Sequence, residues 1–138
     1  MPLNTHLIIW FDMGTIKINE LSVGDWVRWR TYGKGYDVQI VAINDTLIRG
    51  VNDGIEYGVL LKQLESIPIT AEILEKNGFE RMAIGDTYRH NCDIEVTLYG
   101  DGWWHTIGLD EYSLHKINGV HQLQHLLRLY GAEKEIEL

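Results

Sequence analysis

Alternation of apolar and polar positions dominates the chain between residues 16 and 67 and indicates short β-strands. Turn sequences separate these stretches, and Asn52-Asp53-Gly54 is a strong hairpin signal because asparagine and glycine tolerate positive φ. The expected strands lie at residues 25–30, 36–43, 46–51 and 55–61, with a further turn at residues 32–35. Four or five strands within about 50 residues predict an SH3-like β-barrel over residues 16–67.

Residues 68–138 show both helical and strand patterns. Thr70 as N-cap and Gly78 as the terminating residue predict a short helix at residues 70–77. Strands are expected at residues 80–83, 87–89, 93–99 and 103–109, with a final short strand at 135–138. Apolar residues alternate with polar or amphipathic ones from Ile94 to Leu98, which is typical of a sheet with one solvated face.

The clearest helix is expected at residues 118–130. Its apolar positions recur at the i, i+3, i+4, i+7 spacing of a core-facing helix. This face consists of Val120, Leu123, Leu126, Leu127 and Tyr130. Asn118 is the expected N-cap, and Gly131 is expected to end the helix. The opposite side, which we expect to be a solvated polar face, carries His121, His125 and Arg128.

Together these elements predict an α+β protein in two mutually packed parts, because strands and helices are segregated and do not alternate as in βαβ units. The first part is the SH3-like β-barrel at residues 16–67. The second part, at residues 68–138, has a short helix, a three- to four-stranded antiparallel sheet and a C-terminal helix packed on that sheet. Residues 1–15 are interpreted as an N-terminal extension.

The formal net charge of -8 is concentrated in the second part. Residues 1–67 contain six Lys+Arg and eight Asp+Glu, whereas residues 68–138 contain six and twelve. The second part should repel phosphate backbones, so charge leaves nucleic-acid binding open only for the first part. No stretch approaches the roughly 20 apolar residues of a membrane span, and the single cysteine, Cys92, excludes an internal disulfide. We therefore expect a cytoplasmic protein without membrane attachment.

Three segments stand out when taken in order: IKINELSVGDWV at residues 16–27, IPITAEILEKNGF at 67–79, and VHQLQH at 120–125 followed by Gly131 and KEIEL at 134–138. In this order they resemble a family of small proteins carried by phages, prophages and mobile elements of gut bacteria. The resemblance covers the chain from about Ile16 to the C-terminus and implies that residues 1–12 are additional. It implies provenance, and it supplies no activity, cofactor or catalytic residue that could be carried over.

Two groups of residues are candidate binding sites. Alternation in the first strand places Trp26, Arg28 and Arg30 on one face, where the ring could stack on a base while the arginines bind phosphate. Alternatively, the ring packs against a neighbouring element and the arginines lie over apolar surface. Trp103 and Trp104 are adjacent on a strand, so one should point inward and the other toward a partner or covering element.

His121 and His125 are candidate metal ligands, because residues four apart lie on one side of a helix, as a zinc site requires. The zinc-protease motif places a Glu general base after the first His, but Gln122 stands there and cannot take up a proton at neutral pH. His90 and Cys92 lie close in sequence, yet the spacings typical of zinc sites are missing. We therefore expect no hydrolytic metal centre and no cofactor.

The residues favour a non-enzymatic function in which the chain binds another protein, and the resemblance implies that it is an accessory protein of a phage or mobile element. An acidic surface, a small barrel and the lack of a plausible catalytic set all support this hypothesis. A nucleic-acid-associated module that uses the barrel is the alternative. A metal-dependent enzyme that uses His121 and His125 is a third and weaker hypothesis.

Overall fold

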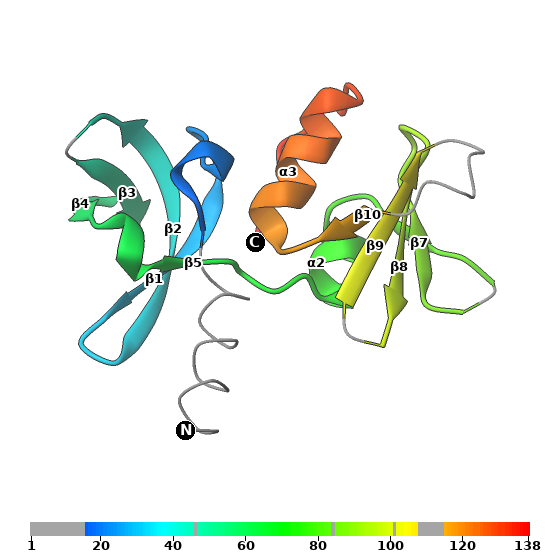
Figure 1. Cartoon of the computed structure of the whole chain (residues 1–138). Helices are drawn as coiled ribbons and strands as arrows, with labels where there is room; N and C mark the ends of the chain where they lie inside the picture. Colours follow the sequence, from blue (N-terminus) through cyan, green and yellow to red (C-terminus); the bar gives the residue numbers. More distant parts are fainter. Residues whose placement is uncertain (1–15, 46, 84, 101, 108–114) are drawn as a thin grey trace. The chain divides into compact units, whose positions relative to one another are not determined.

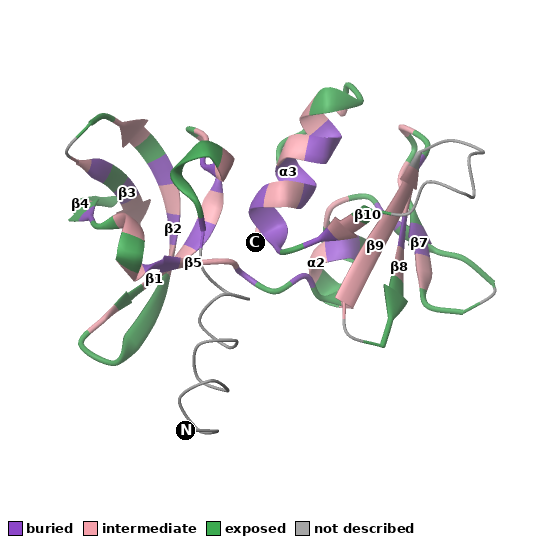
Figure 2. Cartoon of the chain, viewed as in Figure 1, coloured by how far each residue is buried: buried purple, intermediate pink, exposed green. Residues whose placement is uncertain are grey.

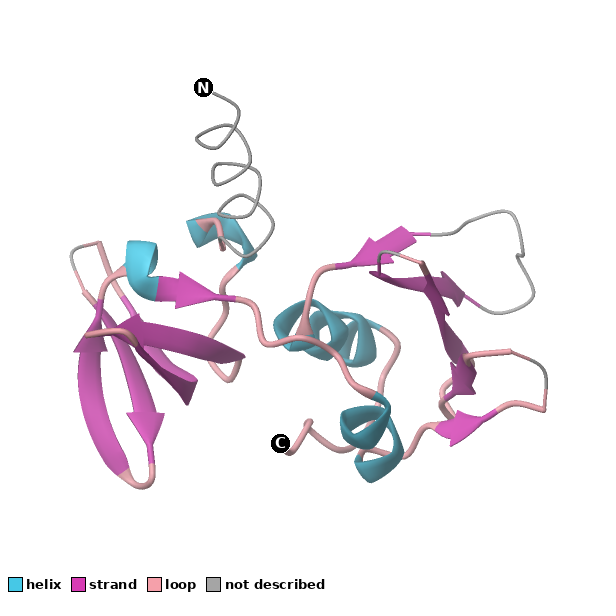
Figure 3. Ribbon diagram, turned by 90° about the horizontal axis from the view of Figure 1, so that it is seen from below, coloured by secondary structure: helices cyan, strands magenta, loops and turns pink. Residues whose placement is uncertain are grey.

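The computed structural model describes residues 16–45, 47–83, 85–100, 102–107 and 115–138 (Figure 1). The predicted N-terminal extension at residues 1–15 therefore lies outside the described residues. The chain divides into two compact units, residues 1–67 and 68–138. Each unit contains a five-stranded antiparallel sheet, so the protein is mostly β (Figure 3).

The N-terminal unit is built on a sheet with the strand order β4-β3-β2-β1-β5. Its strands are β1 (Trp26–Thr31), β2 (Lys34–Ile43), β3 (Ile48–Asn52), β4 (Ile55–Val59) and β5 (Leu64–Glu65). Two short 3-10 helices flank these strands, η1 (Ile18–Glu20) and η2 (Leu61–Gln63). Strands β1 to β4 form a meander, because each pairs with its neighbour in sequence.

Two-residue turns connect the hairpins of this sheet. Tyr32 and Gly33 have φ of 49° and 75°, and Asp53 and Gly54 have φ of 50° and 75°. Positive φ at both central residues is the geometry that matches the right-handed twist of paired strands. The predicted turns at these two positions are therefore confirmed.

The core of the N-terminal unit lies on one face of the sheet. It consists of Ile16, Leu21, Val27, Val38, Ile40, Ile48, Val59 and Leu64. A short turn before β1 fixes the entry to this core. There the buried Asp25 carboxylate accepts from the Ser22 backbone N–H at 2.8 Å, and Ile40 N–H donates to the Asp25 carbonyl at 2.9 Å. This arrangement attaches the start of β1 to the middle of β2.

The C-terminal unit is built on a second sheet, with the strand order β10-β9-β8-β7-β6. Its strands are β6 (Glu80–Arg81), β7 (Thr87–Arg89), β8 (Ile94–Tyr99), β9 (Gly102–Ile107) and β10 (His115–Ile117). The helices of the unit are α2 (Ala71–Lys76) and α3 (Val120–Leu129). The sheet has five strands where three or four were expected, because the three-residue strand β10 was not among the strands predicted from the sequence.

The short helix α2 begins and ends as predicted. The Thr70 hydroxyl accepts from the Ile73 backbone N–H at 3.2 Å, which is the expected N-cap contact. Gly78 follows the helix with φ of 87°. At the C-cap of the helix, the Asn77 side chain pairs with the Glu137 backbone through two hydrogen bonds of 2.7 and 2.8 Å. The final strand predicted at residues 135–138 is wrong, because a side chain holds this segment instead of a neighbouring strand.

Helix α3 is buried over more of its circumference than the apolar pattern predicts (Figure 2). Its buried residues are Val120, His121, Leu123, Gln124, Leu126 and Leu127. The expected apolar residue Tyr130 is instead 36% exposed. The predicted N-cap Asn118 is also wrong, because Gly119 occupies that position with φ of 125°. Gly131 follows the helix with φ of 76°, as expected.

The predicted α+β class with an SH3-like β-barrel and a packed helix is wrong. The described residues form two open five-stranded antiparallel sheets, and neither closes into a barrel. Closure would require the two edge strands of a sheet to pair with each other. In the N-terminal unit the edges are β4 and β5, and β5 is only two residues long. The local pattern identified the four strands of the meander but not β5, and it contained no information on whether the two edges meet.

The close contact between Gly50 on β3 and the Val38 side chain on the neighbouring strand β2 predicts the effect of a substitution at Gly50. A Cβ atom at this buried position would lie 3.0 Å from Val38 Cγ2 and 3.1 Å from Val38 Cβ. We expect Gly50→Ala to lower the free energy of unfolding by about 1–3 kcal/mol, although Gly→Ala in a strand is ordinarily favourable. Urea denaturation measures the change. In a double-mutant cycle, Val38→Ala should reduce the cost of Gly50→Ala, and fully additive effects would contradict the proposed clash.

Candidate functional site

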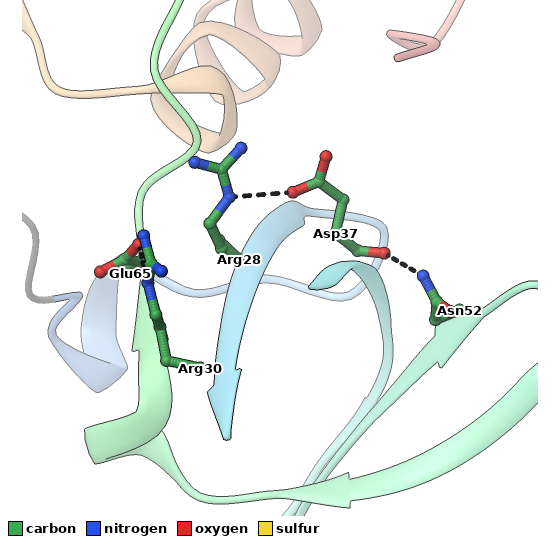
Figure 4. A network of polar contacts seen from close by, with 5 residues as sticks. All are labelled: Arg28, Arg30, Asp37, Asn52 and Glu65. Atoms are coloured by element: carbon green, nitrogen blue, oxygen red, sulfur yellow. Dashed lines mark hydrogen bonds and ion pairs between the residues drawn. The ribbon is translucent and has the colours of Figure 1, made fainter. Parts of the chain in front are cut away.

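Arg28 and Arg30 lie on the solvated face of β1, where the alternation places them, but both are engaged by carboxylates (Figure 4). Arg28 Nε donates to Asp37 Oδ1 at 3.2 Å, and Asp37 lies directly opposite Arg28 on β2. Arg30 Nε donates to Glu65 Oε1 at 2.7 Å. Each positive charge therefore has a negative neighbour, which weakens the attraction of this face for phosphate.

Other residues of the N-terminal sheet contact these ion pairs or lie on the same face. Asn52 Nδ2 donates to the Asp37 carbonyl at 2.9 Å, so β1, β2, β3 and β5 all contribute to the network (Figure 4). Trp26, on the same face, is partly buried and lies opposite Gln39. This face is therefore better described as a polar surface that orders the sheet than as a cationic binding site.

Strand β4 forms an open edge of the N-terminal sheet. It pairs with β3 along one side, and no described strand pairs with its other side. Ile55 at its start is 56% exposed, and Leu60, immediately after it, is 47% exposed. The strand contains neither lysine nor proline, the residues with which proteins commonly protect exposed edges.

The other sheet edges are much shorter. Strands β5, β6 and β10 contain two, two and three residues, whereas β4 contains five. Short edge strands give a partner few backbone groups with which to pair, and this is itself a form of protection. Among the described strands, β4 is therefore the edge best suited to pair with another chain.

The aromatic residues next to β4 are packed against one another. Trp29 lies 5.2 Å from Tyr57 and 5.9 Å from Tyr36, measured between ring centroids. The indole Nε1 of Trp29 donates to Gln63 Oε1 at 3.0 Å. Trp29 and Tyr57 both contact the core, so this group supports β4 from its inner face.

Trp103 and Trp104 lie on opposite faces of β9, as the alternation requires. Trp103 is opposite Leu98 and Ile117, and its indole donates to the Ile69 carbonyl at 2.9 Å. Trp104 is opposite Thr97 and Lys116. Both tryptophans are partly buried. Neither ring is largely exposed, which gives little support to their use as a binding surface. That use stays a prediction.

The predicted metal ligands His121 and His125 differ in environment. His121 is 1% exposed, contrary to the solvated position expected for it, and His125 is partly buried. Their ring centroids are 6.1 Å apart, and the ring planes are nearly perpendicular at 89°. Among the described residues, no group of three or more His, Cys, Asp or Glu side chains is arranged to hold a metal ion.

A hollow of about 210 Å³ lies between the C-terminal sheet and α3. It is lined by His105, Lys116, Ile117, Gln122, His125, Leu126 and Leu129. His105 and His115 are cross-strand neighbours on β9 and β10, with ring centroids 5.4 Å apart. The hollow thus brings together histidines that lie far apart in the sequence.

The contact between His90 and Cys92 is not that of an activated nucleophile. His90 Nδ1 lies 3.0 Å from Cys92 Sγ. Burial raises the pKa of the Cys92 thiol and outweighs the backbone hydrogen bonds that lower it, while the neighbouring Asp93 carboxylate adds the smallest upward effect. Burial also lowers the pKa of His90. The pair is therefore a neutral thiol beside a neutral imidazole, whereas a nucleophilic cysteine needs a lowered pKa.

Comparison with known proteins gives no family for the chain. No family model, curated protein or solved structure matches it. No helix in the described ranges has the length and apolar character to cross a membrane. Function is therefore inferred below from the two features that the sequence pattern missed, the open edge of β4 and the hollow beside α3.

The environment of His105 predicts a pH dependence of stability. Burial first, and then the charge of His115, lower the pKa of His105 from its ordinary value of 6.5. The unfolded chain therefore binds a proton more readily than the folded chain. This contribution to stability is present above pH 6.5 and is lost as pH falls through the lower folded pKa.

We expect the free energy of unfolding to decrease as pH falls below 6.5, and His105→Gln should flatten this decrease. Urea denaturation over a pH series measures both effects. Burial also lowers the pKa of His90, so His90 adds to the same loss of stability at low pH. A His90→Gln variant measures its contribution separately from that of His105. An unchanged slope in His105→Gln would show that His105 titrates with the same pKa in both states.

Proposed function

We propose that this chain is a non-enzymatic accessory protein of a phage or mobile element that acts in the cytoplasm by binding another protein. The partner supplies an extended segment that adds to β4 as a sixth strand of the N-terminal sheet. The observation that supports this proposal is the unpaired five-residue edge of β4, which lacks lysine and proline. Strand addition obtains its affinity from main-chain hydrogen bonds and its specificity from alternate side chains.

The side chains of β4 also suit a docked strand. Ile55, Tyr57 and Val59 fall on one face, and they range from the exposed Ile55 to the fully buried Val59. An incoming strand would extend this apolar face outward from the core. On the opposite face, the Leu47 side chain lies against Gly58, because a Cβ atom at Gly58 would be 3.1 Å from Leu47 Cδ1. Arg49 on β3 and Glu56 on β4 form an exposed ion pair, with 3.4 Å between the guanidinium nitrogen and the carboxylate oxygen.

Charged substitutions at the edge test the proposal. Ile55→Lys and Leu60→Lys change exposed side chains, so we expect stability to change by no more than about 0.5 kcal/mol. We expect each to weaken binding of the captured partner by about tenfold or more, because a lysine at the edge disfavours strand pairing. Affinity capture from the host, followed by titration of the purified partner against each variant, measures the effect.

Val41→Lys is the matched control. Val41 is an exposed valine, 41% accessible, on the interior strand β2, away from the edge. It should leave partner binding unchanged. Hydrogen exchange adds an independent measurement, since strand addition should slow exchange of β4 amides specifically. Loss of binding in Val41→Lys with retention in both edge variants would transfer the interface to the outer face of the sheet.

Nucleic-acid binding through the face of Trp26, Arg28 and Arg30 is the competing proposal. The ion pairs with Asp37 and Glu65 argue against it. We expect no binding of single- or double-stranded DNA or RNA even at low salt, the condition that most favours phosphate contacts. Fluorescence anisotropy measures this. Salt-sensitive binding that disappears in Arg28→Ala and Arg30→Ala would replace the protein-binding proposal for this unit.

A further inference from the structure

The hollow beside α3 has the size of a site for one small group. Its volume of about 210 Å³ is below the roughly 300–1,000 Å³ of pockets that enclose drug-sized ligands. Ile117, Leu126 and Leu129 provide an apolar wall. Leu129 is 75% exposed, so it lies at the rim, whereas Ile117 and Leu126 are buried. These dimensions and this wall suit an aliphatic group comparable to a single side chain.

The polar side chains of the hollow are hydrogen-bond donors. Gln122 Oε1 accepts from the Asn118 backbone N–H at 2.7 Å, which assigns the oxygen to that contact and leaves the amide nitrogen, with its two N–H groups, on the other side. His105 and His125 each carry one N–H when neutral and two when protonated. Among the described residues that line the hollow there is no carboxylate. A ligand with acceptor oxygens therefore complements this lining.

The elements around the hollow also differ in charge from the rest of their unit. Residues 68–138 contain twelve Asp+Glu and six Lys+Arg, a net charge of -6 before the histidines are counted. None of these carboxylates lies on β9, β10 or α3. The basic side chains of these three elements are His105, His115, Lys116, His121, His125 and Arg128. An anion in the hollow would meet no like charge on them.

Lys116 and Arg128 are directed elsewhere. A Cβ atom at Gly102 would lie 2.8 Å from Lys116 Cε, so the lysine stem runs over the sheet face opposite to Ile117. Arg128 Nε donates to both carboxylate oxygens of Glu135, at 3.1 and 3.2 Å. Positive charge within the hollow must therefore come from its histidines.

Acidic residues that neighbour these elements in the sheet or in the sequence are Glu95, Asp110 and Glu111. Glu95 lies on β8 opposite Thr106 and Arg89, on the sheet face away from His105. Asp110 and Glu111 lie between β9 and β10 in the sequence, outside the described residues. Apart from Lys116, whose stem lies on the other sheet face, the ionisable groups of the described lining are imidazoles, so its charge depends on pH.

We propose that the hollow is a binding site for a small aliphatic carboxylate and that it binds this ligand more tightly as pH falls. The aliphatic group packs against Leu126 and Leu129, and the carboxylate accepts hydrogen bonds from Gln122 and from the imidazoles of His105 and His125. The same chemistry is present in a free carboxylic acid and in the C-terminal residue of a peptide. This site belongs to the C-terminal unit and does not depend on the edge of β4.

Proton linkage gives the sign and size of the pH effect. Burial and the charge of His115 lower the pKa of His105, so this ring is neutral at pH 7 before ligand binds. A bound carboxylate stabilises the imidazolium, so binding is accompanied by proton uptake. If ligand binding raises the pKa of this imidazole by about one unit, the affinity is about three- to fourfold higher at pH 6 than at pH 7.5.

A matched pair of ligands tests the carboxylate directly. N-acetyl-leucine and N-acetyl-leucinamide have the same aliphatic group, but only the first carries a carboxylate. Each is titrated into the full-length, ¹⁵N-labelled chain at pH 7.5 and pH 6, and backbone amide shifts are followed. We expect the acid to shift residues of β10 and α3, with about fourfold tighter binding at pH 6. The amide should bind several-fold more weakly at both pH values.

Substitutions at the exposed rim avoid loss of folding. Leu129→Glu introduces a carboxylate beside the hollow, whereas Leu129→Gln has nearly the same shape without the charge. We expect the acid to bind several-fold more weakly to the Glu variant than to the Gln variant. His105→Gln keeps a donor but cannot titrate, so it should reduce the pH dependence while retaining binding at pH 7.5.

Each outcome of these titrations decides the proposal. Equal binding of the acid and the amide, weaker binding at pH 6, or no shift at β10 and α3 with either ligand would overturn it. A second pair of ligands is a peptide that ends in leucine with a free carboxylate and the same peptide with an amidated C-terminus. If the free form binds and the amidated form does not, the ligand is a chain terminus. If only the free acid binds, the ligand is a small molecule. Both of the latter results support the carboxylate site.

Discussion

Backbone hydrogen bonding between neighbouring strands is the constraint on which both units depend. An antiparallel sheet satisfies its N–H and C=O groups fully only where each strand has a neighbour on both sides, and closure into a barrel is the arrangement that removes edges. Here both sheets stay open, and three of their four edges are strands of two or three residues. Strand β4 alone presents five residues. The main surface available to a partner is therefore a row of backbone groups, which no side-chain motif would reveal.

Features that depend on local sequence could be predicted, and features that depend on distant pairing could not. Asp53-Gly54 forms its turn and Thr70 caps its helix because each needs only residues within three or four positions. Strands β5 and β10 are too short for alternation to indicate them. Barrel closure depends on the meeting of two edges, which periodicity does not encode. The error in fold class therefore came from assuming closure, while the strands of the meander were largely in their predicted places.

The candidate sites show the same division between local and distant information. Alternation placed Arg28 and Arg30 on one face correctly, but their carboxylate partners are nine and 35 residues away, so their neutralisation could not be foreseen. The helical wheel placed His121 on the polar side, yet the structure buries it, because the packing around α3 extends beyond its apolar stripe. The hollow combines His105 with His125, residues on a strand and a helix that only the tertiary fold brings together.

The order of strands also has a consequence for how the chain folds. In the second sheet every pair joins strands that follow one another in sequence, and in the first sheet the pairing of β1 with β5 is the single exception. Short loops cost little entropy to close, so these hairpins can form early and successively. The pairing of β1 with β5 spans the whole meander and must come last in its unit. Strand β5 lies at the end of the first unit, immediately before the second unit begins. The pairing that completes the first sheet therefore also fixes the position in the chain from which the second unit starts.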